Sequence, residues 1–339
     1  MSPARRIAIA GAGSIGCYVG GCLALAGREV RFLLRPRLCD ELTRHGLHLT
    51  DLDGTDRRLP AEALALSTDA ATVLGGADLV LVTVKSGDTA AMAALLAAHC
   101  PAGTTILSLQ NGVGNADILA RALPGRRVLA GTVPFNVVQA GQGRFHRATG
   151  GPVLVEATGD RLTDILAVPG LPLAAAADMP AVQWGKLLLN LNNALNALCG
   201  LPLRAELADR RWRRLLAAQQ REALAALAAA GIRPARIGAV RPSLLPRLLD
   251  LPDPLFRLLA GRMLRIDPEA RSSMWEDLHF RRPTEVDWLQ GAVVDLAGRA
   301  GLEAPVNRRV HAAVKAAEAA GRGSPGLTPD ALLRGGSGP

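Results

Sequence analysis

The stretch Ile7–Gly16, IAIAGAGSIG, decides the fold of the first half of the chain. Four apolar residues of strand length run directly into Gly11-x-Gly13-x-x-Gly16, and a segment of helix length follows. A second apolar run begins at Val30. A strand, a glycine-rich turn, a helix and a second strand within about 30 residues form the context in which this motif indicates a dinucleotide-binding βαβ unit.

Each glycine of the motif has a physical role. Gly11 permits the tight turn, Gly13 lets the backbone approach a pyrophosphate, and Gly16 allows the helix to pack closely on the strand. The N–H groups at the start of the helix then point at the phosphates. We therefore predict that the turn binds the cofactor through Gly11, Ala12, Gly13, Ser14, Ile15 and Gly16.

Further apolar runs continue the pattern. They are Val30–Leu34, Ala77–Val84, Thr104–Leu109 and Val128–Thr132, with helix-like segments such as Thr89–Ala98 between them. Uninterrupted apolar strands that alternate with helices are typical of a parallel sheet covered on both faces. We predict an α/β fold with a doubly wound, Rossmann-type dinucleotide-binding domain over residues 1–178, in which hairpins occupy residues 132–155.

The second half of the chain is predicted to be helical almost throughout. The expected helices are 180–198, 203–230, 262–278, 284–300 and 306–320, with a loop or short helices in the Pro- and Arg-rich stretch 231–258. These segments predict an all-helical second domain over residues 179–320. Gly, Pro and Ser are frequent in residues 321–339, which we expect to form a flexible tail.

The composition narrows the classes of function. The 339 residues are 49% hydrophobic, enough for two cores, whereas the 3% of aromatic residues argues against stacking platforms for single-stranded nucleic acid. The net charge is +9, but the arginines are scattered, which favours a solvated basic surface over a nucleic-acid patch. Only Lys85, Lys186 and Lys315 of the 39 cationic residues are lysines. Each lysine is therefore a candidate for a specific role.

The five cysteines are dispersed, with no C-x-x-C pair and no zinc-ligand spacing. This usage is typical of reduced thiols, so we expect a cytoplasmic protein without a metal site. The uncharged residues after Arg6 imitate a signal peptide, but the glycines among them make a poor membrane helix. We predict no nucleic-acid or membrane partner, and a monomer or a homodimer.

Three strand ends carry residues suited to a cofactor. The second strand ends on Arg35 with no acidic residue at its tip, which favours the 2′-phosphate of NADP over the 2′-hydroxyl of NAD. Lys85 and Asn111 follow the next two strands, at the edge where open α/β sheets bind ligands. We predict NADPH as the cofactor, bound also by Arg35, Lys85 and Asn111. The alternatives are that Arg35 is a solvated arginine, that Lys85 is a surface lysine and that Asn111 only forms an Asn-Gly turn.

The segment WGKLLLNLNN at residues 184–193 carries the strongest candidate for catalysis. At about 100° per residue, Asn190 and Asn193 lie about 40° and about 20° from Lys186, so the three share one helix face. A lysine and amides on an apolar helix are costly unless they face a polar cleft. Partial burial also lowers the pKa of a lysine, which suits a proton donor. The alternative is a lysine that reaches solvent beside amides bonded to other helices.

A second polar segment reads SSMWED at residues 272–277 and RRPTEVD at residues 281–287. Thr284 is predicted to be a helix N-cap in a near capping box with Asp287, which makes Glu285 the first helical residue. The helix dipole stabilises a carboxylate there, and it can pair with a lysine or a substrate hydroxyl. The alternative is that Glu285 only decorates the helix start.

Together these motifs resemble the ketopantoate reductase (2-dehydropantoate 2-reductase) family over residues 6–320. The resemblance rests on GAGSIG with Arg35, VTVK, LQNGVG, WGKLLLN and RSSMWEDL…RPTEVD. It implies that residues 179–320 form a substrate and dimerisation domain like the C-terminal domain of 6-phosphogluconate dehydrogenases, with a site in the cleft between the domains. It also implies NADPH-dependent reduction of 2-dehydropantoate to pantoate in pantothenate biosynthesis. Alternatives are a related reductase of another 2-oxo acid or an imine, and a non-enzymatic NADP sensor or nucleic-acid binder.

The resemblance further implies roles for individual residues. Lys186 would donate the proton to the carbonyl oxygen, with Glu285 supporting the site. The family pattern often has an asparagine eight residues after the lysine, where this chain has Ala194, so Asn193 or Asn192 takes its place. The implied substrate contacts are Asn111, Lys186, Asn190, Asn193 and Ser273.

Overall fold

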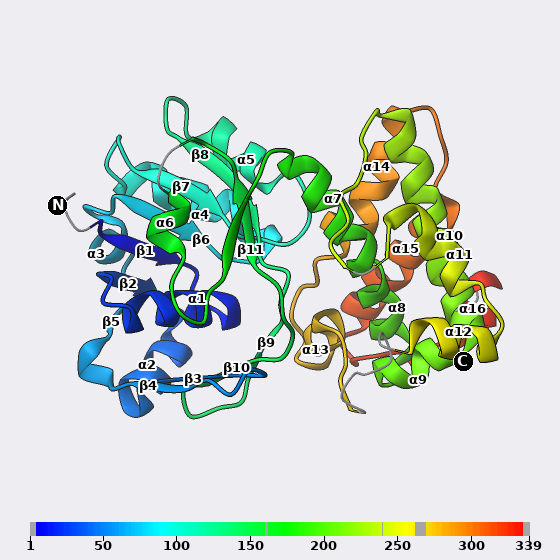
Figure 1. Ribbon diagram of the computed structural model, residues 1–339, viewed down its shortest axis with the longest axis horizontal. Helices are drawn as coiled ribbons and strands as arrows, with labels where there is room; N and C mark the ends of the chain where they lie inside the picture. The colour runs from blue at the N-terminus through cyan, green and yellow to red at the C-terminus, as the bar shows by residue number, and fades with distance from the viewer. Residues whose placement is uncertain (1–4, 160–161, 239, 262–268, 335–339) are drawn as a thin grey trace. The chain divides into compact units, whose positions relative to one another are not determined.

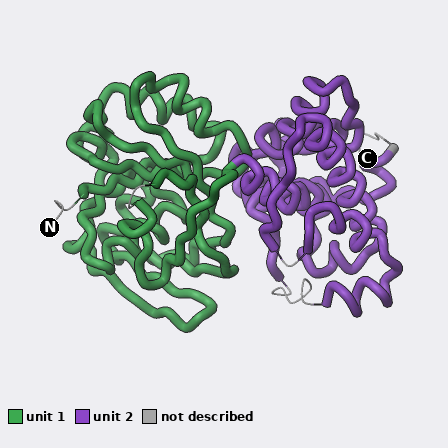
Figure 2. Tube along the Cα trace, turned by 45° about the horizontal axis from the view of Figure 1, so that its top comes forward, with its two compact units in different colours: residues 1–179 green, residues 180–339 purple. Residues whose placement is uncertain are grey.

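The computed structural model describes residues 5–159, 162–238, 240–261 and 269–334. The chain divides into two compact units, Met1–Met179 and Pro180–Pro339 (Figure 2). Within the described residues, no helix has both the length and the apolar character needed to cross a membrane.

An eight-stranded sheet forms the centre of the first unit (Figure 1). In spatial order its strands are β12 (Leu173–Ala176), β11 (Val153–Glu156), β8 (Val128–Thr132), β7 (Thr105–Ser108), β6 (Leu79–Val82), β1 (Ile7–Ala10), β2 (Val30–Leu33) and β5 (Ala65–Ser67). All neighbouring strands are parallel except β8 and β11. The predicted Rossmann-type sheet is confirmed.

Helices connect these strands and leave both faces of the sheet buried. They are α1 (Ser14–Leu25), α2 (Pro36–His45), α3 (Ala70–Leu74), α4 (Thr89–His99), α5 (Asn115–Ala122) and α6 (Leu162–Leu166), with 3₁₀ turns η1 (Ala61–Ala63) and η2 (Ser86–Asp88). Ile7 and Ile9 of β1 belong to one hydrophobic cluster, and Ala8 and Ala10 belong to another. Because alternate residues of a strand point to opposite faces, a strand covered on both sides reads as an uninterrupted apolar run.

A second, four-stranded sheet extends the first unit. Its strands, in spatial order, are β4 (Asp56–Leu59), β3 (Leu47–Asp51), β10 (Arg144–Arg147) and β9 (Val137–Gln139). β9 and β10 form one of the hairpins expected over residues 132–155, and β10 also pairs in parallel with β3. β3, β4 and β5 were not predicted from the sequence, and neither was β12 of the main sheet.

The regular secondary structure of the described residues in the second unit is helical, which confirms the all-helical prediction. The α-helices are α7 (Met179–Asn190, whose first residue belongs to the first unit), α8 (Asn192–Cys199), α9 (Leu203–Ala208), α10 (Arg210–Ala229), α11 (Leu245–Leu249), α12 (Asp253–Ala260), α13 (Ser273–His279), α14 (Ala292–Arg299), α15 (Pro305–Ala320) and α16 (Pro329–Arg334). A 3₁₀ turn, η3 (Pro242–Leu244), precedes α11, and a π-helix, η4 (Asp287–Gly291), precedes α14.

Several helices are shorter than expected. The segment 203–230 divides at Asp209, whose carboxylate accepts the Arg211 N–H at 2.8 Å and caps α10. In the segment expected over 262–278, residues 262–268 lie outside the described residues, and α13 begins only at Ser273. A side-chain oxygen that accepts a backbone N–H starts a new helix in this way. Hydrophobic periodicity alone does not detect such a break, so it predicts one continuous helix.

The flexible tail expected over residues 321–339 is wrong for residues 321–334. The Leu327 N–H donates to the Leu198 carbonyl at 2.9 Å, and α16 follows, with Leu332 only 3% exposed. Residues 335–339 lie outside the described residues. Burial of the apolar Leu332 side chain stabilises this segment, which its Gly and Pro content alone did not indicate.

Candidate functional site

The glycine-rich turn between β1 and α1 is shaped by close backbone packing. Gly11 has a φ of +84°, and a Cβ there would collide with Cγ1 of Val84. A Cβ at Gly16 would lie 2.5 Å from Oγ1 of Thr83. At Gly13, in contrast, a Cβ would meet nothing within 4 Å of the described residues, and no side chain caps the start of α1. The turn therefore leaves open space beside uncapped helix N–H groups, where an anionic group fits.

Arg35 and Lys85 lie where β2 and β6 end. Arg35 is the N-cap residue of α2, and its side chain is 82% exposed. Its Nη2 lies 3.0 Å from Oδ2 of Asp88, which belongs to η2, and Lys85 is the N-cap residue of η2. An exposed ion pair of this kind contributes little stability, so the guanidinium can exchange its partner for a phosphate at small cost.

Asn111 is held by a polar network at the ends of β6 and β7. Its carbonyl accepts hydrogen bonds from Oγ of Ser86 at 2.9 Å and Nδ2 of Asn115 at 2.7 Å. Oγ1 of Thr89 donates to Oδ1 of Asn115 at 2.8 Å. Sequence reasoning missed Thr89 and Asn115; the available signal was a polar residue in the first turn of each helix after a strand.

The Glu285 carboxylate acts electrostatically on Lys186 within the second unit. Lys186 is partly buried on α7, and burial lowers its pKa to about 8, while the Glu285 carboxylate acts in the opposite direction. A lysine with such a pKa is largely protonated at neutral pH and releases its proton readily. Glu285 therefore lies close enough to Lys186 for its charge to act on the lysine.

The segment around Glu285 differs from the expected capping box. Oγ1 of Thr284 does accept the Val286 N–H at 3.3 Å, but Glu285 itself precedes the helix, which opens as the π-helix η4. Asp287 does not turn back to Thr284, because its carboxylate bonds to His311 and Lys315 of α15. Single π turns often occur at functional sites, where they redirect side chains.

Asn190 and Asn193 flank a break in the predicted helix 180–198. α7 ends at Asn190 and α8 begins at Asn192, although Leu191 keeps helical backbone angles of −56° and −26°. Gln220 donates to the Leu188 carbonyl at 3.1 Å, and Gln290 donates to the Leu191 carbonyl at 2.9 Å. These buried amides satisfy carbonyls at the break.

The two candidate asparagines left open by the sequence have different partners. The Asn192 side chain hydrogen-bonds to Glu206. The backbone carbonyl of Asn193 accepts a hydrogen bond from Oγ of Ser272 at 3.0 Å. Ala194 is completely buried. Asn193, next to the start of α13, is therefore the better candidate for a ligand contact.

Ser273 is exposed at the first position of α13, and a buried chain of hydrogen bonds holds that helix start. The Ser272 N–H donates to Oδ1 of Asn196 at 2.8 Å, and Nδ2 of Asn196 donates to Oε2 of Glu206 at 2.7 Å. Burial raises the pKa of Glu206 to about 8. Glu206 was missed by sequence reasoning because it looks like any glutamate on a short helix.

Glu206 is expected to make folding less favourable as the pH rises. Its folded pKa of about 8 exceeds its ordinary value of 4.5, so the folded state holds a proton that the unfolded state releases between these pH values. In that window the free energy of unfolding falls with rising pH, by up to about 1.4 kcal/mol per unit. Glu206→Gln keeps a neutral hydrogen-bonding group, so its unfolding in urea should lose less stability between pH 5.5 and 8. Identical pH slopes for both proteins would contradict this assignment.

The first unit has the βαβ sheet of dinucleotide-binding proteins, and the helical second unit carries Lys186 under the influence of the Glu285 carboxylate. This combination is typical of a dinucleotide-dependent oxidoreductase. Two family models match the chain: "Ketopantoate reductase PanE/ApbA" over residues 7–159 and "Ketopantoate reductase PanE/ApbA C terminal" over residues 178–318. The chain belongs to the ketopantoate reductase family of oxidoreductases.

Individual relatives agree with this assignment. The chain is 32% identical over 324 residues to a 2-dehydropantoate 2-reductase of Halobacterium salinarum. The alignment covers 92% of this chain and 99% of that protein. The crystal structure of a PanE/ApbA family ketopantoate reductase from Ralstonia eutropha matches with a TM-score of 0.80 and 31% identity, covering 94% of this chain and 99% of that one. A D-mandelate dehydrogenase in ternary complex with NADH matches with a TM-score of 0.76 at 21% identity, which shows a shared fold alone.

Proposed function

We propose that this chain reduces 2-dehydropantoate to pantoate with NADPH. The observation that carries the proposal is the partly buried Lys186 in a chain of the ketopantoate reductase family: burial lowers its pKa to about 8, and the Glu285 carboxylate opposes that shift. We expect the reaction in the cytoplasm, and a monomer or a homodimer.

The cofactor would be held by the first unit. The glycine-rich turn, with its open space at Gly13, accommodates a pyrophosphate at the start of α1, and Arg35 offers a guanidinium to the 2′-phosphate. Lys85 and Asn111 lie at the ends of the neighbouring strands. When bound, reduced nicotinamide supplies a hydride for C2 of the substrate.

The substrate would be oriented and protonated by the second unit. Nζ of Lys186 donates a proton to the carbonyl oxygen as it gains negative charge, and Glu285 favours the protonated lysine before reaction. Asn190, Asn193 and Ser273 supply amide and hydroxyl groups for the carboxylate and hydroxyl of the substrate. In this scheme Asn111 contacts both cofactor and substrate.

A second candidate substrate is another 2-oxo acid. The observation that favours it is Ala194, which stands fully buried where the family often has an asparagine. Loss of one amide contact changes which hydroxyl or carboxylate positions are recognised, because a site built to bond a polar group discriminates strongly against its absence.

A panel of 2-oxo acids tests the proposal directly. NADPH oxidation is followed with 2-dehydropantoate, 2-oxo acids that lack its hydroxyl, and aromatic 2-oxo acids at matched concentrations. The expected result is the highest kcat/KM with 2-dehydropantoate. Turnover of 2-dehydropantoate at background, with another member of the panel reduced well, would replace the substrate.

A further inference from the structure

Glu285 lies between two residues that are anchored to α15. The Thr284 N–H donates to Oε1 of Glu318 at 2.6 Å. On the other side, the Asp287 carboxylate contacts Nε2 of His311 at 2.6 Å and Nζ of Lys315 at 3.1 Å. We call Asp287, His311, Lys315 and Glu318 the α15 tether.

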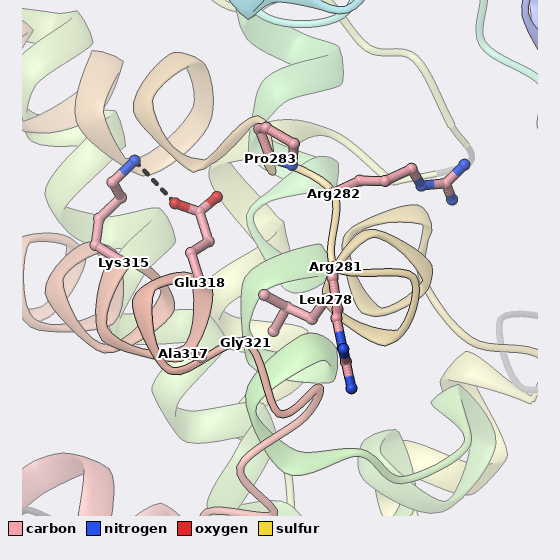
Figure 3. Close-up of a pocket in the computed structure, with 8 residues that line it drawn as sticks. All are labelled: Leu278, Arg281, Arg282, Pro283, Lys315, Ala317, Glu318 and Gly321. Atoms are coloured by element: carbon pink, nitrogen blue, oxygen red, sulfur yellow. Dashed lines mark ion pairs between the residues drawn. The ribbon is translucent and has the colours of Figure 1, made fainter.

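Lys315 joins both halves of the tether. Its Nζ lies 2.8 Å from Oε2 of Glu318, the pair drawn beside Pro283 in Figure 3, while it also donates to Asp287. An ammonium group has three donors that point in different directions, so one lysine can hold two carboxylates from two segments. The anchors on Thr284 and Asp287 are thereby coupled.

The tether binds a backbone N–H that is buried just below the surface. Thr284 is 5% exposed, and the side chain of Glu318 is 16% exposed. A hollow of about 340 Å³, lined in part by Arg281, Arg282 and Lys315, adjoins them (Figure 3). Removal of the Glu318 carboxylate would leave the buried Thr284 N–H without its acceptor, which favours movement of the segment toward another partner.

The π-helix anchors the same segment at a second place. Asp287 begins η4 and faces α15, while Gln290 within η4 reaches the Leu191 carbonyl at the break between α7 and α8. Lys186 lies on α7, close to that break. The segment that carries Glu285 is therefore anchored both to α15 and to Leu191, the residue that follows the helix of Lys186.

We propose that Lys315 and Glu318 are positioning residues for Glu285: through Thr284 and Asp287 they hold its carboxylate where it acts on Lys186. The effect on catalysis rests on the proposed function, whereas the effect on the position of Glu285 does not. The third lysine of this arginine-rich chain thus serves the same site as Lys186.

The test measures the titration of Lys186 in the absence of substrate. The chain has three lysines, so selective ¹³Cε labelling gives three signals, which the variants assign. Because the Glu285 carboxylate raises the pKa of Lys186, displacing it should lower that pKa. We expect Glu318→Ala to shift the Lys186 titration down by about half a pH unit or more, and Lys315→Gln to shift it in the same direction. Glu318→Gln keeps an oxygen that can accept the Thr284 N–H, so the Lys186 titration in this variant should stay close to that of the unmodified protein.

Arg308→Ala is the matched control, since Arg308 is an exposed cation on α15 outside the tether. It should leave the Lys186 titration unchanged. His311, the other titratable group on Asp287, stays intact in every variant, as does the Arg282–Asp277 pair near the segment. An unchanged titration in both folded Glu318→Ala and folded Lys315→Gln would overturn the proposal, as would an equal shift in Arg308→Ala.

Kinetics separate this inference from the proposed function. With 2-dehydropantoate, Glu318→Ala should lower kcat about tenfold and move the alkaline limb of its pH profile to lower pH, with NADPH affinity unchanged. A shifted Lys186 titration in a protein that does not reduce 2-dehydropantoate would support the tether and reject the substrate. Normal turnover and an unmoved pH profile in Glu318→Ala would reject the tether alone.

Discussion

Replacement of Lys186 by alanine is expected to lower kcat by about 10²–10⁴ and to leave NADPH affinity largely intact. The lysine is the proposed donor of the proton that neutralises the developing alkoxide, whereas the glycine-rich turn for the cofactor lies on the first unit. Steady-state kinetics give kcat, and fluorescence titration gives the Kd of NADPH. In the unmodified enzyme, kcat should fall above about pH 8 as Lys186 loses its proton.

A double-mutant cycle with Glu285 provides the control for this prediction. Glu285→Ala should also lower kcat, and the double variant should lose far less than the product of the two single effects, because the pair serves one substrate as a unit. Strictly multiplicative losses would separate the two residues. A folded Lys186→Ala protein with near-normal kcat would remove Lys186 from the mechanism.

Arg35→Ala is expected to erase most of a preference for NADPH over NADH of roughly ten- to more than a hundredfold. A charge-assisted contact between the guanidinium and the 2′-phosphate contributes about 1.5–3 kcal/mol, and NADH cannot make it. The exposed pair with Asp88 offers only weak competition. The ratio of the two Kd values measures the effect.

Arg37→Ala is the matched control, because Arg37 is also exposed and lies two residues further, in the first turn of α2. It should keep the preference for NADPH. Equal affinity of the unmodified protein for NADH and NADPH would refute the assignment of Arg35. A preference that survives in Arg35→Ala but is lost in Arg37→Ala would move the role to the second arginine.

The central strands of the main sheet could be predicted because they are buried on both faces. Ile7–Ala10 is apolar at every position, and a glycine motif of known geometry follows it. β4 has the opposite character: Asp56–Leu59 reads DRRL, and three of its four residues are exposed. It is a strand because it pairs with β3, and no local pattern reports such a pairing.

The candidate site divides in the same way. Lys186 and Glu285 could be found because a charge on an apolar helix and a carboxylate at a helix start are locally unusual. Glu206 and Glu318 could not, since each resembles an ordinary helical glutamate until its distant partners, Asn196 and Thr284, are known. The break at Leu191 was equally hidden, because Gln220 and Gln290 stabilise it from other helices.

The parallel pairing of β3 with β10 sets an order of events for the folding chain. The two strands are separated by the segment that contains β6, β7 and β8, so the entropy of closing that long loop opposes their early contact. Arg147 of β10 forms a buried ion pair with Asp51 of β3, and neither charge is compensated in this way before the strands meet. β3 and β10 each have a local partner, β4 and β9, so only their pairing with one another depends on closing the loop. The hydrogen bonds between β3 and β10 should therefore gain protection from exchange after β1, β6 and β7 have assembled.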